Sequence, residues 1–244
     1  MKAIMLAAGL GSRISELTNS VPKAMIKISN KYIFEIVIDK LIETGINDLI
    51  IVIGYKANLL KTEINKIYKN VNVKISYVRN EEYASTNTMY SLWLAKEKLN
   101  CPFLFLHGDL IFNHKMLDSF VKSKYSNSIL VDKRFPLDWD DAMKVISHNR
   151  KLKYMSKQIT LNEMDGIAIG VYKFDLRGSK ALFSVISNLI NKKVYSSWVS
   201  EAINILSKKI DINIDYNDSN HPWTDVDNLN DLEMGLKIYK EICK

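Results

Sequence analysis

The sequence is poor in the residues that build disulfide frameworks and zinc sites. Only two cysteines occur in 244 residues. Cys101 and Cys243 form neither a C-x-x-C pair nor a disulfide pattern, which favours a reducing, cytoplasmic environment. His114, His148 and His221 have no zinc-type spacing to other ligands. No zinc site is therefore expected.

Prolines and long apolar runs are also scarce. The chain has only four prolines and no Pro/Ser/Gly-rich linker or internal repeat, so residues 1–244 are predicted to form a single domain. No apolar run approaches the ~18 residues of a membrane span. The N-terminus also lacks the layout of a signal peptide. We therefore expect no membrane partner and a cytoplasmic location.

The net charge of +7 does not by itself indicate a nucleic-acid partner. The lysines are spread along helix-like segments, and no aromatic residues are interleaved with them as in RNA-binding motifs. Solvated helix faces are the favoured interpretation, so no nucleic acid is expected as a partner. The positive field would help to attract small anionic substrates.

What the chain does contain is an alternation of strand-like and helix-like segments. Strands are predicted at residues 3–7, 48–53, 73–78, 102–106 and 127–131. Helices are predicted at about 34–44, 57–69, 88–99 and 114–124. This rhythm predicts an α/β fold with a mostly parallel, Rossmann-like central sheet flanked by helices.

The first strand leads into a loop of small residues, Leu6-Ala7-Ala8-Gly9-Leu10-Gly11-Ser12-Arg13, which is followed by Pro22-Lys23. Gly9 and Gly11 can present successive backbone N–H groups to an anion. Arg13 and Lys23 supply the fixed positive charge that a triphosphate and its transition state require. A Walker A loop and the third glycine of a dinucleotide fingerprint are both absent from this stretch. The loop therefore predicts nucleotidyl transfer, with Arg13 and Lys23 as the catalytic cations.

Two acidic positions are candidates for a divalent cation site. Asp109 follows the apolar strand 102–106 and so lies at the carboxyl end of a central strand, where open α/β sheets bind ligands. Asp225 and Asp227 lie two residues apart and would share one face of a strand. The alternatives stay open: Asp109 could be a turn or N-cap residue, and Asp225 and Asp227 could cap a helix.

The loop resembles the signature of the nucleotidylyltransferases that activate sugar phosphates and small phosphorylated amines or alcohols, L-A-A-G-x-G-S/T-R followed by P-K. This resemblance extends along essentially the whole chain and implies a nucleotide-diphospho-sugar transferase-like fold. It also implies a Mg²⁺ site formed by Gly108-Asp109 and Asp227, with Asp225 as a neighbour. The resemblance implies nucleotide contacts from Leu6, Ala7, Ala8, Gly9, Gly11, Ser12, Asn80, Tyr83, Ala84, Ser85, Thr86 and Gly108.

The segment from Asn80 to Leu92 is similar to the branch that contains phosphocholine and aminoalkylphosphonate cytidylyltransferases. Thr88 departs from the asparagine that is commoner there. The same segment also has the pattern of a capped helix with an apolar core stripe. Both interpretations can hold, because the amides at the start of such a helix would lie beside the nucleotide.

After residue 131 the pattern changes. Residues 1–131 are interpreted as the nucleotide-binding core, 132–175 as a small acceptor-binding insertion, and 176–244 as the part that carries the second metal ligand. Further strands are predicted at 142–147, 152–156, 165–174 and 210–215, and helices at 177–191, 197–207 and about 228–242.

Four residues are predicted to bind the acceptor. Lys144, Lys157 and Asp165 lie in motifs that resemble the cytidylyltransferase branch, and Lys157 is suited to an acceptor phosphate. Trp139 is flanked by acids, Asp141 among them, and could receive a cationic amine. Surface exposure is the alternative for Lys157 and for these acids.

The sequence therefore predicts a Mg²⁺-dependent cytidylyltransferase that joins CTP to a small phosphorylated acceptor, releases pyrophosphate and supplies precursors of surface polysaccharides or phospholipids. A homodimer is left open. Three alternatives remain: a sugar-1-phosphate nucleotidyltransferase that uses another nucleotide, a glycosyltransferase that uses Asp225-Val226-Asp227 as a D-x-D motif, and a non-catalytic nucleotide-sensing module. The identity of the acceptor is not fixed by the sequence.

Overall fold

A computed structural model of the chain describes residues 1–18, 20–134 and 141–242. The strands are β1 (Lys2–Ala7), β2 (Lys27–Ile28), β3 (Lys31–Tyr32), β4 (Asp48–Ile53), β5 (Lys74–Arg79), β6 (Phe103–His107), β7 (Leu110–Phe112), β8 (Ser128–Asp132), β9 (Lys144–His148), β10 (Lys151–Ser156), β11 (Gly166–Phe174), β12 (Asn213–Tyr216) and β13 (Trp223–Asp225). The α-helices are α1 (Ser15–Thr18), α2 (Ile33–Glu43), α3 (Ala57–Ile67), α4 (Thr88–Leu94), α5 (His114–Lys122), α6 (Leu176–Asn191), α7 (Val199–Ser207) and α8 (Leu229–Ile242).

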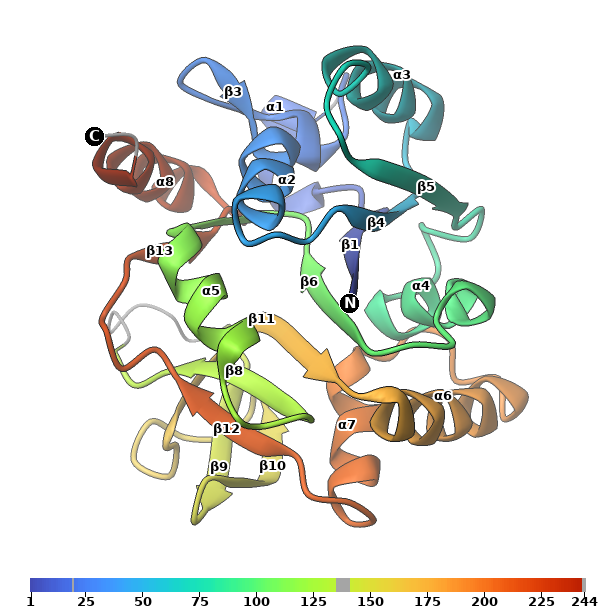
Figure 1. The fold of residues 1–244 in the computed structure, drawn as a ribbon, viewed down its shortest axis with the longest axis vertical. Helices are drawn as coiled ribbons and strands as arrows, with labels where there is room; N and C mark the ends of the chain where they lie inside the picture. Colours follow the sequence, from blue (N-terminus) through green and yellow to red (C-terminus); the bar gives the residue numbers. More distant parts are fainter. Residues whose placement is uncertain (19, 135–140, 243–244) are drawn as a thin grey trace.

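One sheet runs through the molecule in the order β5-β4-β1-β6-β11-β8-β12-β10-β9. Strands β5, β4, β1 and β6 are parallel, with β5 at the edge, and β4, β1 and β6 are buried, so β1 is apolar on both faces. Met5 packs in the layer of α2 and α5, whereas Ile4 and Leu6 pack in the layer of α4 and α6 (Figure 1). The predicted α/β fold with helices on both faces of the sheet is confirmed.

The second half of the sheet is mixed. Strand β11 runs antiparallel to both β6 and β8, and β12 is parallel to β8. The order continues through β10 to β9, and β9 pairs back onto β11 at Gly166. Strands β11, β8, β12, β10 and β9 thus close into a small ring, in which residues 144–174 supply three of the strands.

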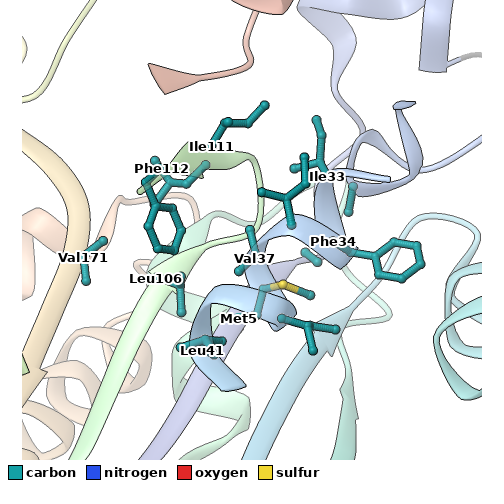
Figure 2. Close-up of a cluster of buried hydrophobic side chains, with 14 of the residues drawn as sticks. Met5, Ile33, Phe34, Val37, Leu41, Leu106, Ile111, Phe112 and Val171 are labelled. Carbon is teal, nitrogen blue, oxygen red and sulfur yellow. The ribbon is translucent and has the colours of Figure 1, made fainter. Parts of the chain in front are cut away.

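The core beneath the N-terminal strands holds α2 against the sheet. Figure 2 shows Met5 of β1, Val37 and Leu41 of α2, Leu106 of β6 and Phe112 of β7 in one cluster. Each of them is at most 2% exposed. Burial of such side chains contributes about 1.5–3 kcal/mol each. The cluster therefore holds β7, and with it the backbone of the adjacent Asp109, in place against α2.

A short two-stranded sheet that the sequence analysis missed joins the two acidic motifs. Strand β13 pairs antiparallel with β7, and Asp225 lies opposite Leu110. The backbone N–H of Val226 donates to the carbonyl of Asp109 at 3.0 Å. Strand β13 ends at Asp225, so the prediction that Asp225 and Asp227 share one strand is wrong, because the paired register ends where Asp225 lies opposite Leu110. No helix of the described residues is long and apolar enough to cross a membrane.

Asp132 at the end of β8 is a structural hub, and its loss is expected to destabilise the fold. Its buried carboxylate accepts hydrogen bonds from Arg134, from Asn217 Nδ2 at 2.8 Å and from Trp223 Nε1 at 2.9 Å. Asp132→Ala removes a buried charged acceptor shared by Asn217, Trp223 and the half-exposed Arg134, and we expect a loss of about 3 kcal/mol in the free energy of unfolding. Urea denaturation at pH 7 measures it.

The contribution of Asp132 to the free energy of unfolding should depend on pH. Burial alone would raise the pKa of Asp132, but hydrogen bonds from Arg134, Asn217 and Trp223 outweigh burial and hold it below its usual value. The carboxylate therefore stabilises the fold above the unfolded-state pKa of about 4, and this contribution is lost as the pH falls towards the folded-state value. The difference between wild type and Asp132→Asn should shrink with acidification; a constant difference would contradict this role.

Candidate active site

A cavity of about 570 Å³ opens at the carboxyl ends of β1 and β6. The loop after β1 forms one wall, and the turn after β6 forms the floor. Residues that precede α4 line one side, and residues after β10 line the opposite side. This is the edge at which open α/β sheets bind ligands.

Two glycines shape the loop after β1. Gly11 has a φ of 67°, and a Cβ there would come within 3.0 Å of Thr18 and 3.1 Å of Lys23. Thr18 Oγ1 donates to the carbonyl of Gly11 at 3.0 Å and holds the turn. Gly54, at the end of β4, has no room for a Cβ, which would lie 2.6 Å from the carbonyl oxygen of Ala8 and 2.8 Å from Tyr83 Cβ.

Gly54→Ala is therefore expected to displace both walls that Ala8 and Tyr83 form. Overpacking of this kind costs about 1–3 kcal/mol of stability, and we expect a roughly tenfold increase in the dissociation constant for the nucleotide. Gly9→Ala is the matched control for stability, because a Cβ at Gly9 meets nothing within 4 Å. Thermal unfolding and nucleotide titration measure the two effects. A Gly54→Ala variant with wild-type affinity would show that the walls are independent of this contact.

Lys23 joins the two predicted metal ligands. Its Nζ lies 2.5 Å from Asp109 Oδ2 and also donates to Asp227 Oδ1. The Lys23 side chain is 13% exposed. Burial alone would lower the pKa of Lys23, but the charges of Asp109 and Asp227 outweigh it and raise the pKa above its ordinary value. Lys23 is therefore a permanent cation at the cavity floor.

The carboxylates around Lys23 carry more negative charge than this lysine neutralises. Asp109 Oδ1 is buried without a hydrogen-bond partner among the described residues. Burial, together with the charges of Asp109 and Asp227, raises the pKa of Asp225 to about 7. Among the described residues, no group of three or more His, Cys, Asp or Glu side chains is arranged to hold a metal ion. Mg²⁺ is usually bound through one or two carboxylates together with substrate phosphates, so the Asp109–Asp227 pair fits its chemistry.

His107 forms part of the cavity wall between β1 and β11. Its Nε2 is buried without a partner among the described residues, and burial lowers the pKa of the imidazole. Gly170 of β11 lies against the ring, and a Cβ there would be 3.0 Å from Nδ1. A neutral imidazole is therefore held close to Asp109 and Lys23.

Asn80 organises the wall that precedes α4. Its side chain is fully buried, donates to Thr86 Oγ1 and Ser91 Oγ at 3.0 Å each, and accepts from the N–H of Glu82 at 3.0 Å. Asn87 caps α4 by accepting from the N–H of Thr88. The capped-helix interpretation of this segment is correct, and the cap lies at the cavity as expected.

Three residues from separate segments meet at one side of the cavity. They are Asp141 before β9, Lys157 after β10 and Trp198 before α7. Lys157 Nζ lies 2.8 Å from Asp141 Oδ1 and 4.8 Å from the centroid of the Trp198 ring. Arg13 reaches across from the loop after β1, with one guanidinium nitrogen 2.6 Å from Asp141 Oδ2 and the other 2.7 Å from Asp227 Oδ2. A chain of alternating charges therefore links the two sides of the cavity.

The structure brings most of the predicted site residues to this cavity. Those that line it are Leu6, Ala7, Ala8, Gly9, Gly11, Ser12, Arg13, Lys23, Asn80, Tyr83, Thr86, Gly108, Asp109, Lys157, Asp225 and Asp227.

Four predicted residues of the described chain do not line the cavity. Ala84 and Ser85 are exposed beyond its wall. The buried Lys144 donates to the carbonyl of Lys157, and Asp165 accepts from the N–H of Ser147, so both stabilise the strands behind the site. Trp139 lies outside the described residues.

Trp198 and His107 line the cavity although neither was predicted from the sequence as a site residue. Trp198 precedes α7, more than a hundred residues from the loop after β1, and only the fold brings it beside Lys157. A clue for His107 was available, since it ends the strand that leads to Asp109.

Comparison with known proteins identifies the family of the chain. The chain matches the nucleotidyl transferase family model over residues 2–133. A choline-phosphate cytidylyltransferase from Streptococcus pneumoniae is 36% identical over 125 residues, which cover 51% of this chain and 52% of that protein. A CTP:phosphoglutamine cytidylyltransferase from Campylobacter jejuni is 27% identical over an alignment of 262 residues, which covers 97% of this chain and 100% of that protein.

The fold has solved counterparts. An inositol-1-phosphate CTP transferase from T. maritima superposes with a TM-score of 0.79 at 20% identity, over 99% of this chain and 97% of that one. The sequence alignments span about half the length of the choline-phosphate cytidylyltransferase and all of the phosphoglutamine enzyme. The predicted resemblance to cytidylyltransferases is confirmed, and the chain belongs to the nucleotidyl transferase family of enzymes.

Proposed function

We propose that this protein transfers a cytidylyl group from CTP to a small phosphorylated acceptor and releases pyrophosphate. The observation that carries the proposal is the position of Lys23, held between Asp109 and Asp227 and packed against Gly11 of the loop after β1. Such an arrangement suits transfer of a phosphoryl group, where catalysis rests on positioning and on stabilisation of charge. The cytidylyltransferases among the relatives support CTP as the nucleotide.

The chain's own residues have distinct parts in this proposal. Arg13 and Lys23 bind the triphosphate and stabilise the negative charge that develops on it. Ala8, Gly9 and the wall from Tyr83 to Thr86 bind the base and ribose. The acceptor phosphate is already a nucleophile, so no general base is required.

We further propose that Asp109 and Asp227 bind Mg²⁺, with the carboxyl group of Asp225 beside them. The unpartnered oxygen of Asp109 and the mutual repulsion of these carboxylates support a cation at this point. When bound, the ion neutralises charge on the transferred phosphate and on the leaving pyrophosphate. Lys23 orients both carboxylates through its ion pairs with them.

The acceptor is proposed to enter beside Lys157 and Trp198. Lys157 provides a cation for the acceptor phosphate, and the ring of Trp198 already lies against a positive charge. The relatives act on phosphocholine and phosphoglutamine as their names state, and both are small phosphorylated compounds. The domain boundaries predicted from the sequence, with the acceptor side in 132–175, remain part of this proposal.

An acceptor screen tests the function. Purified protein with Mg²⁺ and each of the four nucleoside triphosphates is incubated with phosphocholine, aminoethylphosphonate, phosphoglutamine or a sugar 1-phosphate, and the products are identified by mass spectrometry. A CDP-linked product with equimolar pyrophosphate is the expected result. Preferential use of another nucleotide would contradict the assignment of CTP, and a sugar-linked product would favour the sugar-phosphate branch.

A further inference from the structure

Asp141 occupies a position between two cations at the mouth of the cavity. Its carboxylate lies 2.6 Å from an Arg13 nitrogen and 2.8 Å from Lys157 Nζ. Arg13 belongs to the loop after β1, and Lys157 follows β10, so the contact bridges the nucleotide and acceptor sides. Burial alone would raise the pKa of Asp141, but hydrogen bonds and charge from Lys157 and Arg13 lower it, so the group is a carboxylate at neutral pH.

These ion pairs differ from the pairs at the cavity floor. The Arg13 and Asp141 side chains are 56% and 62% exposed, whereas the Lys23 side chain is 13% exposed. The Lys157 side chain is 23% exposed. Ion pairs with a solvent-exposed partner contribute little to stability, so a ligand can exchange them. The two oxygens of Asp141 therefore lie where a phosphate that bridges Arg13 and Lys157 would place its own oxygens.

We propose that Asp141 is a selectivity residue that competes with bound anions for Arg13 and Lys157. The proposal rests on the proposed function, in which these two cations bind substrate phosphates. A simple anion gains little, because it must displace a carboxylate that is already held in place. A nucleoside triphosphate is held by Arg13, Lys23 and the loop after β1, so it displaces Asp141 from Arg13 alone and leaves the ion pair with Lys157 in place. The residue thus lowers the affinity for inorganic phosphate relative to that for substrates.

The test replaces Asp141 with asparagine, which keeps the shape of the side chain and removes its charge. Inorganic phosphate is the probe, and its dissociation constant is measured by calorimetry, together with its inhibition constant against CTP. We expect Asp141→Asn to bind phosphate about fivefold to tenfold more tightly, as the loss of the ion pairs with Arg13 and Lys157 implies. The ratio of the inhibition constant for phosphate to the KM for CTP should also fall, because the variant frees two cations for phosphate and only one for CTP. Asp118→Asn, which removes an ion pair with Lys122 on α5, is the matched control and should leave both values unchanged.

Two further variants separate this proposal from the proposed function. Arg13→Ala and Lys157→Ala should each weaken phosphate binding. If both weaken it and Asp141→Asn does not tighten it beyond twofold, the role of Asp141 is wrong and the phosphate-binding roles stand. If neither variant changes binding of phosphate or CTP, the assigned roles of the two cations are wrong, and the role of Asp141 fails with them.

Discussion

Asp109→Asn and Asp227→Asn are each expected to lower kcat by at least about a hundredfold, which is the scale of losing one preorganised charge at a transferring phosphate. Asparagine has nearly the same shape and can still accept a hydrogen bond from Lys23, but it removes the anionic oxygen proposed to bind Mg²⁺. The steady-state rate at saturating CTP and acceptor measures the effect. Addition of EDTA to wild type should abolish transfer, and MgCl₂ in excess should restore it.

Direct binding provides a second measurement for these carboxylates. Mn²⁺ titration followed by electron paramagnetic resonance should show weaker ion binding in both variants with CTP present, while thermal unfolding stays close to wild type. Asp231→Asn is a useful comparison, since Asp231 also lines the cavity but accepts hydrogen bonds from the N–H groups of Asp227 and Asn228. Near wild-type turnover and Mn²⁺ affinity in Asp109→Asn would remove Asp109 from the proposed ion site.

Lys23→Met is expected to lower kcat by about 10²–10³. Methionine keeps much of the length of lysine but carries no charge, and in the proposed function the charge that develops in the reaction lies on a triphosphate beside this position. Removal of Lys23 also leaves Asp109 and Asp227 without their shared partner. Since breaking a buried ion pair from one side costs about 3–5 kcal/mol, the variant should also unfold at a lower temperature in the absence of nucleotide.

Arg13→Ala is expected to show the catalytic effect of losing a cation without the loss of stability expected for Lys23→Met. Arg13 contacts Asp227 and Asp141 from a largely exposed position, so its loss should lower kcat while changing the free energy of unfolding little. Single-turnover measurements at saturating CTP compare the chemical step in the two variants. If either substitution changed only the KM for the acceptor, the assignment of that cation to the triphosphate would be wrong.

The parts of the fold that the sequence predicted are those with strong periodicity. The buried runs of β1 and β4, and the amphipathic helices α2 and α6, were located within one or two residues. The short strands β7 and β13 were missed, because three residues carry too little periodic signal. β13 follows α7 and pairs with β7 from a much earlier part of the chain, so no local sequence pattern shows this pairing.

The residues of the candidate site also divide into those that the sequence could predict and those that it could not. The loop from Leu6 to Arg13 carries its chemistry in consecutive residues, so it could be predicted from the sequence. Trp198 could not, since its approach to Lys157 depends on how α7 packs against β10. Lys144 was assigned to the site on a motif, yet its ammonium group is directed to the backbone of Lys157. A motif locates the strand but does not decide on which side of it each charged group lies.

The ring closed by β9 on β11 constrains how the two sides of the cavity can move. Strand β11 pairs with β6 of the parallel sheet through residues 171–174 and with β9 through residues 166–167. A hinge between the parallel half of the sheet and the ring that carries β9 and β10 would have to break one of these ladders. Motion on substrate binding is thus expected in the connecting loops, and the amides of β11 should be among the slowest of the chain to exchange with deuterium.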